Sequence, residues 1–139
     1  MSDQLVRLVS FGVLLVHGLG HGGALGALAW IALRPGSDTG AWTAARSWLL
    51  PSLAPGTATL MASAFWIVSL VGFVVAALAF WLAGGDAWRP IAIGTALVSG
   101  LGVVLFFGTW PMFNTLAALV VNAAVLVALV VLRWTPPAA

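Results

Sequence analysis

Two histidines near the middle of the first long apolar stretch are the residues of this chain whose chemistry is easiest to name. His17 and His21 lie four residues apart within FGVLLVHGLGHGGALGALAW, so a helix would place both imidazoles on one face. Imidazole ligates metal ions and haem iron, and it exchanges protons near neutral pH. These two side chains are therefore the candidate metal ligands.

Their spacing limits what the two imidazoles can hold. Side chains four apart on one helix reach a metal ion from the same side, and they cannot take the two opposite axial positions of one haem. A bis-histidine haem within one chain is excluded because there is no third histidine. A metal site needs more ligands, from water, Asn122 or a second copy of the chain. Ligation of a tetrapyrrole by a single histidine remains open.

Glycines accompany the histidines on the same helix. Gly18, Gly22 and Gly26 form a GxxxGxxxG row, which permits close approach of another helix or of a flat ligand. A later segment offers a matching row of small residues, Ala92, Ala96 and Gly100. Two interpretations stay open: ordinary packing, either between these two segments or between two copies of the chain, and a cofactor surface.

The elements that carry these residues are predicted to span a membrane. The chain of 139 residues is 63% hydrophobic and 6% charged, with a mean hydropathy of +1.15, far outside the range of water-soluble domains. Four apolar segments are each near or above the roughly 20 residues that a spanning helix needs. They cover about residues 5–33, 58–83, 89–108 and 113–133. We expect one all-α, four-helix transmembrane domain over residues 1–139, with a short interfacial helix over about residues 41–50.

The histidines fall at the depth of the bilayer centre. The midpoint of the first predicted helix is Leu19, which places each imidazole about 3 Å from it. The midpoints of the other three helices fall near Ser69, Ser99 and Asn122. We expect one buried polar layer, in which the imidazoles either join neighbouring helices by hydrogen bonds or form a functional site. The candidate cofactor-binding residues are His17, His21, Gly18, Gly22, Asn122, Ser69 and Ser99.

Several residue types are absent from the chain, and this excludes several functions. There is no Cys, Tyr, Lys or Glu, which removes thiolate and Schiff-base chemistry. Asp3, Asp38 and Asp86 all lie outside the predicted spans, so a carboxylate proton relay has no residues to use. Five arginines against three aspartates are too small an excess to indicate nucleic acid. The lack of most catalytic residue types favours a role that is not enzymatic.

The layout of the chain resembles a group of short bacterial four-helix integral membrane proteins with an HGLxH-type first helix. The likeness rests on LLVHGLGH, a longer loop, two close-set helices and a last helix entered through FFGTWPMFNTLA. More loosely, the chain is similar to the DoxX-like family, some of whose members are membrane subunits that work with quinone-linked oxidoreductases. The resemblance implies the fold, and it supplies no catalytic motif.

From the sequence we favour a small membrane subunit or scaffold that packs against partner membrane proteins, or against a second copy of itself, through glycine-rich helix faces. The alternative is a tetrapyrrole- or metal-binding protein that uses His17 or His21 in electron transfer or quinone-linked chemistry. A small-solute or proton-linked transporter is the second alternative. The expected surroundings are the lipid bilayer of a bacterial inner membrane, with no nucleic acid partner. Three arginines on the side of the termini against two on the other side predict cytoplasmic termini.

Overall fold

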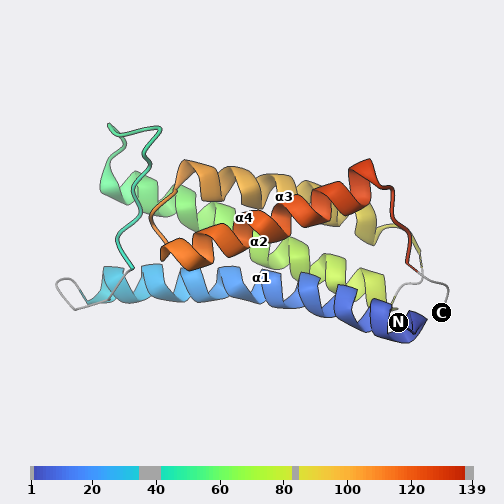
Figure 1. Cartoon of the computed structure of the whole chain (residues 1–139). Coiled ribbons are helices and arrows are strands. Elements are labelled where there is room, and N and C mark those ends of the chain that lie inside the picture. The colour runs from blue at the N-terminus through green and yellow to red at the C-terminus, as the bar shows by residue number, and fades with distance from the viewer. Residues whose placement is uncertain (1, 35–41, 83–84, 137–139) are drawn as a thin grey trace.

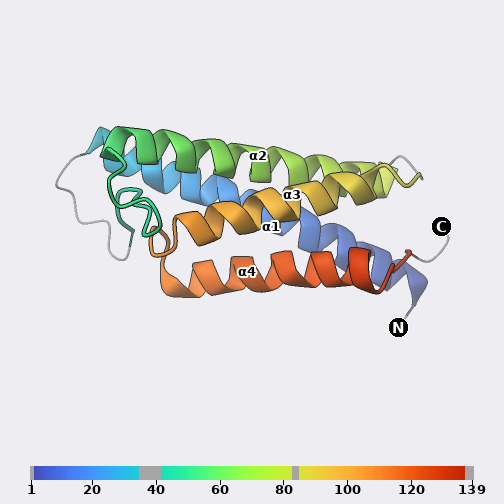
Figure 2. The same cartoon turned by 90° about the horizontal axis from the view of Figure 1, so that it is seen from above.

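The computed structural model describes residues 2–34, 42–82 and 85–136, which form four long helices (Figure 1, Figure 2). They are α1 (Asp3–Leu33), α2 (Pro55–Leu82), α3 (Trp88–Leu105) and α4 (Met112–Leu126), and α4 continues into a π-helical turn, η1 (Val127–Val131). All four spans, with α4 and η1 taken together, are long and apolar enough to cross a membrane. No strand is present in these ranges. The predicted all-α, four-helix membrane bundle is confirmed.

The helices run alternately up and down, so that α1 begins and η1 ends at the same end of the bundle (Figure 1). Each helix packs on the next along the chain: α1 on α2, α2 on α3, and α3 on α4. At about 1.5 Å per residue, α1 is about 46 Å long and α3 about 27 Å. Because α1 exceeds the roughly 30 Å of a hydrocarbon core, it must tilt or project, and Figure 2 shows it crossing the bundle obliquely.

The glycines of α1 do not pack where the sequence suggested. A Cβ built on Gly18 would lie 3.0 Å from Cβ of Phe73 and 3.2 Å from the carbonyl oxygen of Leu70, and Gly22 also faces Leu70. Both neighbours belong to α2, whereas Gly26 faces open space. The expected match between this glycine row and the small residues of α3 is therefore wrong. Helices that follow one another in sequence are usually neighbours in space, and α1 packs on α2 here.

Two other glycines bring α2 and α3 close together. A Cβ on Gly72 would lie 2.2 Å from Oγ1 of Thr95, and a Cβ on Gly102 would lie 2.8 Å from Cβ of Phe65. Neither glycine could carry a side chain unless the facing helix moved. Close helix approach through small residues is typical of membrane bundles, and here it positions the polar residues of α3 against the centre of the bundle.

The loop before α2 corrects a second prediction. Residues 42–54 form no helix, so the interfacial helix expected over residues 41–50 is not formed in the described part; residue 41 lies outside it. Instead, the Ser47 hydroxyl donates to the carbonyl of Leu105 (2.8 Å), and the Trp48 indole N–H donates to the preceding carbonyl (2.6 Å). The last carbonyls of a helix have no partner within it, and these loop side chains supply one at the end of α3.

Candidate functional site

A polar layer crosses the bundle between two apolar core clusters. One cluster, toward the chain termini, includes Leu14, Phe73, Ala96 and Val125, and the other includes Ala24, Trp66, Val103 and Ala118. Along every helix, the predicted polar residue falls between members of the two clusters. The side chains of this layer that are at most 2% exposed are His21, Ser69, Ser99 and Asn122. His17 is half-buried.

Hydrogen bonds join four of these side chains into one chain. Nε2 of His17 bonds to Oδ1 of Asn122 (2.9 Å), Nδ2 of Asn122 donates to Oγ of Ser99 (2.9 Å), and Oγ of Ser99 bonds to Nε2 of His21 (3.0 Å). This hydrogen-bond chain starts and ends on α1 and passes through α4 and α3. It therefore ties α1 to two helices that are not its immediate neighbours in sequence.

The direction of these bonds assigns the tautomer of His17. An amide oxygen only accepts, so Nε2 of His17 carries the hydrogen and Nδ1 of His17 carries a lone pair. Oγ of Ser99 accepts from Asn122 and is also bonded to Nε2 of His21, where either atom can be the donor. His17 therefore presents an acceptor nitrogen at Nδ1.

The two Nδ1 atoms differ in their surroundings. Among the described residues, neither has a hydrogen-bond partner. Nδ1 of His21 is enclosed in the core, whereas Nδ1 of His17 is not among the enclosed atoms and lies on a half-buried side chain. The acceptor nitrogen of His17 is therefore the accessible end of the hydrogen-bond chain.

Ser69 lies in the polar layer but is not connected to the hydrogen-bond chain. Its hydroxyl donates to the carbonyl of Phe65 (2.7 Å), four residues earlier on the same helix. Hydroxyls of serine in membrane helices commonly bond to this carbonyl. The structure thus brings together His17, His21 and the polar residues of α3 and α4, while Ser69 satisfies its hydrogen bond within α2.

An aromatic cluster surrounds His21. The ring centroid of His21 lies 5.7 Å from that of Trp66 and 5.2 Å from that of Trp110, and the two indoles are 4.8 Å apart. Nε1 of both indoles and Oγ1 of Thr109 are buried with no partner among the described residues, and each such group costs about 1 to 3 kcal/mol. Trp110 is only 8% exposed, so it packs inside the bundle. No short-range signal reveals its contact with His21.

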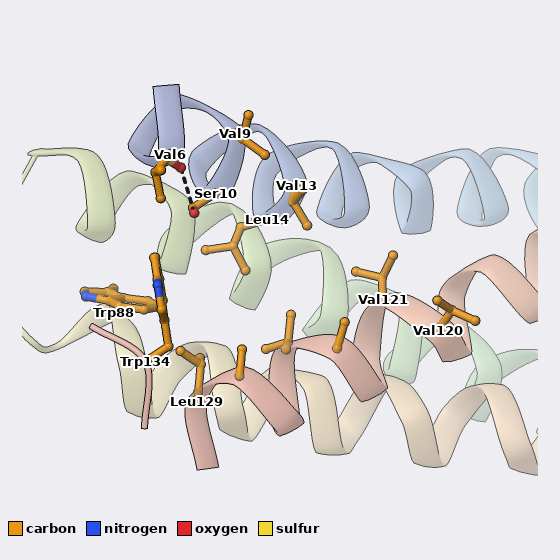
Figure 3. A pocket seen from close by; sticks show the side chains of 13 residues that line it. Val6, Val9, Ser10, Val13, Leu14, Trp88, Val120, Val121, Leu129 and Trp134 are labelled. Carbon is orange, nitrogen blue, oxygen red and sulfur yellow. Dashed lines mark hydrogen bonds between the residues drawn. The ribbon is translucent and has the colours of Figure 1, made fainter. Parts of the chain in front are cut away.

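A groove between α1 and α4 gives access to the layer. Cavities of about 430 Å³ and 550 Å³ lie along it, open at the surface, and share Val9, Val13 and Val121 in their linings. We call these two adjoining cavities the α1/α4 groove. Figure 3 shows its part nearest the chain termini, where Val9 and Val13 of α1 lie across from Val120 and Val121 of α4. The other part is lined by groups that include His17, His21, Trp110 and Phe113.

The geometry of the histidines does not favour the cofactors considered above. Nε2 of each imidazole already takes part in a hydrogen bond, and the described residues contain no cluster of three or more His, Cys, Asp or Glu side chains that could hold a metal ion. Gly18 and Gly22, expected to make room for a tetrapyrrole, lie against α2 instead. The space beside them is occupied by Phe73 and Leu70.

The fold and the polar layer together define an integral membrane four-helix bundle, with a hydrogen-bond chain at mid-depth that is reached through a lateral groove. No protein-family model, no curated protein and no solved structure matches this chain.

Proposed function

We propose that this protein is a non-enzymatic, membrane-embedded binding protein that holds a lipid-soluble molecule in the α1/α4 groove. The observation that carries the proposal is the half-buried His17, whose Nδ1 has no partner among the described residues and which lines the groove at mid-depth. In hydrocarbon, an unpaired polar group is costly because no water is there to bond it. A molecule in the groove with a polar head and an apolar body would provide the missing bond.

The remainder of the groove suits an apolar body. The part in Figure 3 is lined mainly by aliphatic side chains of α1 and α4, and Trp88 and Trp134 lie at its end (Figure 3). This proposal keeps the ligand-binding role expected for His17 and His21, and it replaces the tetrapyrrole or metal ion with an amphipathic molecule. The quinone-linked setting implied by the DoxX-like resemblance stays a prediction.

The experiment fills the groove and measures what remains bound. Gly12 and Gly20 line the groove, and a Cβ on either would meet nothing within 4 Å, so Gly12→Leu and Gly20→Leu are the substitutions chosen to fill it. Gly94 on α3 is equally open and lines neither cavity, which makes Gly94→Leu the matched control.

Apolar molecules extracted from the purified proteins are compared by mass spectrometry. We expect wild type and Gly94→Leu to retain an enriched lipid-soluble molecule, and Gly12→Leu and Gly20→Leu to lose it. Identical extracts from all four proteins, with only bulk lipid in each, would refute ligand binding in the groove.

A second candidate function is the membrane subunit or scaffold expected from the sequence, and the open glycines of α1 support it. Gly23 and Gly26 are exposed, and a Cβ on either would meet nothing within 4 Å. A partner helix, from another protein or from a second copy, could approach α1 closely there. Crosslinking in membranes tests this: Gly23→Leu should abolish a crosslinked species that Gly94→Leu retains, and its persistence in Gly23→Leu would rule the role out.

The transport alternative has less support. The apolar clusters on both sides of the layer, typified by Phe73 and Val103, leave no polar path between the two ends of the bundle among the described residues.

For location, we propose the bacterial inner membrane with cytoplasmic termini. The support is the distribution of Arg7, Arg89 and Arg133 at one end against Arg34 and Arg46 at the other.

A further inference from the structure

We propose that the molecule in the α1/α4 groove carries a hydroxyl group, which donates a hydrogen bond to Nδ1 of His17. This inference depends on the proposed binding function and specifies the head group of the ligand. A neutral imidazole has one donor and one acceptor nitrogen. Because Oδ1 of Asn122 takes the hydrogen of Nε2, the nitrogen left for a ligand is the acceptor. The complementary head group is a donor.

The bonding of Asn122 supports this assignment. Its Nδ2 donates to Oγ of Ser99 (2.9 Å), so its oxygen is the atom that faces His17. In the arrangement described, a ketone or an ether would place a lone pair against the lone pair of His17. A hydroxyl would not.

The walls near His17 favour a ring on which this hydroxyl is mounted. Trp110 and Phe113 line the part of the groove that contains His17. Toward the chain termini the lining becomes aliphatic, as Figure 3 shows. The expected ligand is a lipid-soluble hydroxyl compound, with its ring at mid-depth and its apolar tail along the valines of α1 and α4.

The test compares three probes that share a ten-carbon tail: 4-decylphenol, its methyl ether 4-decylanisole, and 4-decylcyclohexanol. The protein is reconstituted in nanodiscs with ¹⁵N-labelled histidine, which gives simple spectra because there are two histidines. We expect the phenol to bind about five- to tenfold more tightly than the ether, the change for one lost hydrogen bond. We also expect it to shift the Nδ1 signal of His17. The cyclohexanol distinguishes an alicyclic alcohol from a phenol as the source of the hydroxyl.

Two variants serve as controls. His17→Phe should bind the phenol and the ether equally well. Ser69→Ala removes a polar group at the same depth that lies outside both cavity linings, and it should retain the preference. Equal binding of phenol and ether to wild type, or a preference that survives in His17→Phe, would overturn the hydroxyl assignment and leave the binding function standing. If no probe binds at all, the proposed function itself fails.

Discussion

Replacing Gly72 by alanine tests whether α2 and α3 are as close as the structure shows. The added Cβ would lie 2.2 Å from Oγ1 and 2.8 Å from Cγ2 of Thr95, while ordinary contacts begin near 3.4 Å. Thr95 is β-branched and lies within a helix, so it has few rotamers with which to move aside. The helices would have to separate locally, and overpacking of this kind costs about 1 to 3 kcal/mol.

Gly94→Ala is the matched control for this substitution. It lies on α3, and its Cβ would meet nothing within 4 Å. Both substitutions gain the same helix propensity, about 1 kcal/mol, which cancels in the comparison. Gly72→Ala should therefore be less stable than Gly94→Ala by about 1 to 3 kcal/mol, the overpacking cost alone.

The free energy of unfolding is measured by titration with SDS in mixed micelles, followed by circular dichroism. Adding Thr95→Ala to Gly72→Ala should restore part of the loss, because it removes the contacts to Oγ1 and Cγ2 and leaves the tight contact of 3.0 Å to Cβ of residue 95. If Gly72→Ala and Gly94→Ala unfold with equal free energies, the two helices are further apart than described and the argument is refuted.

Three other substitutions test the polar contacts. Asn122→Leu breaks the hydrogen-bond chain between the histidines, so it should shift the ¹⁵N signals of both imidazoles. It should also lower the free energy of unfolding by about 1 kcal/mol, because two hydrogen bonds of about 0.6 kcal/mol each are lost. Unchanged spectra would contradict the hydrogen-bond chain. Ser47→Ala leaves a carbonyl at the end of α3 unpaired and should lower the free energy of unfolding by about 1 kcal/mol. Ser52 is exposed, so Ser52→Ala should not change this free energy in the same SDS titration. Equal losses in the two variants would speak against the loop contact. Arg89→Met removes the donor to the carbonyl of Leu129 and should speed amide exchange in η1, measured by mass spectrometry; unaltered exchange would show that this bond does not hold the turn.

The sequence alone determined the solvent, the number of helices and the depth of the polar residues. A bilayer requires the backbone to bond internally and sets a minimum span, so hydropathy and length identified four helices. The constant rise per residue then converts position into depth. That is why His17, His21, Ser99 and Asn122 could be assigned to one level, and the structure joins them there by hydrogen bonds.

Only the tertiary structure decided which way each helix faces and what lies beside it. Ser69 is at the predicted depth but bonds within α2, Gly18 meets α2 in place of α3, and Trp110 packs on His21. The physical reason is that lipid tails are as apolar as a leucine-rich helix face, so hydrophobicity does not distinguish an inward face from an outward one. Helix rotation is decided instead by close packing and by a few hydrogen bonds between residues far apart in the chain.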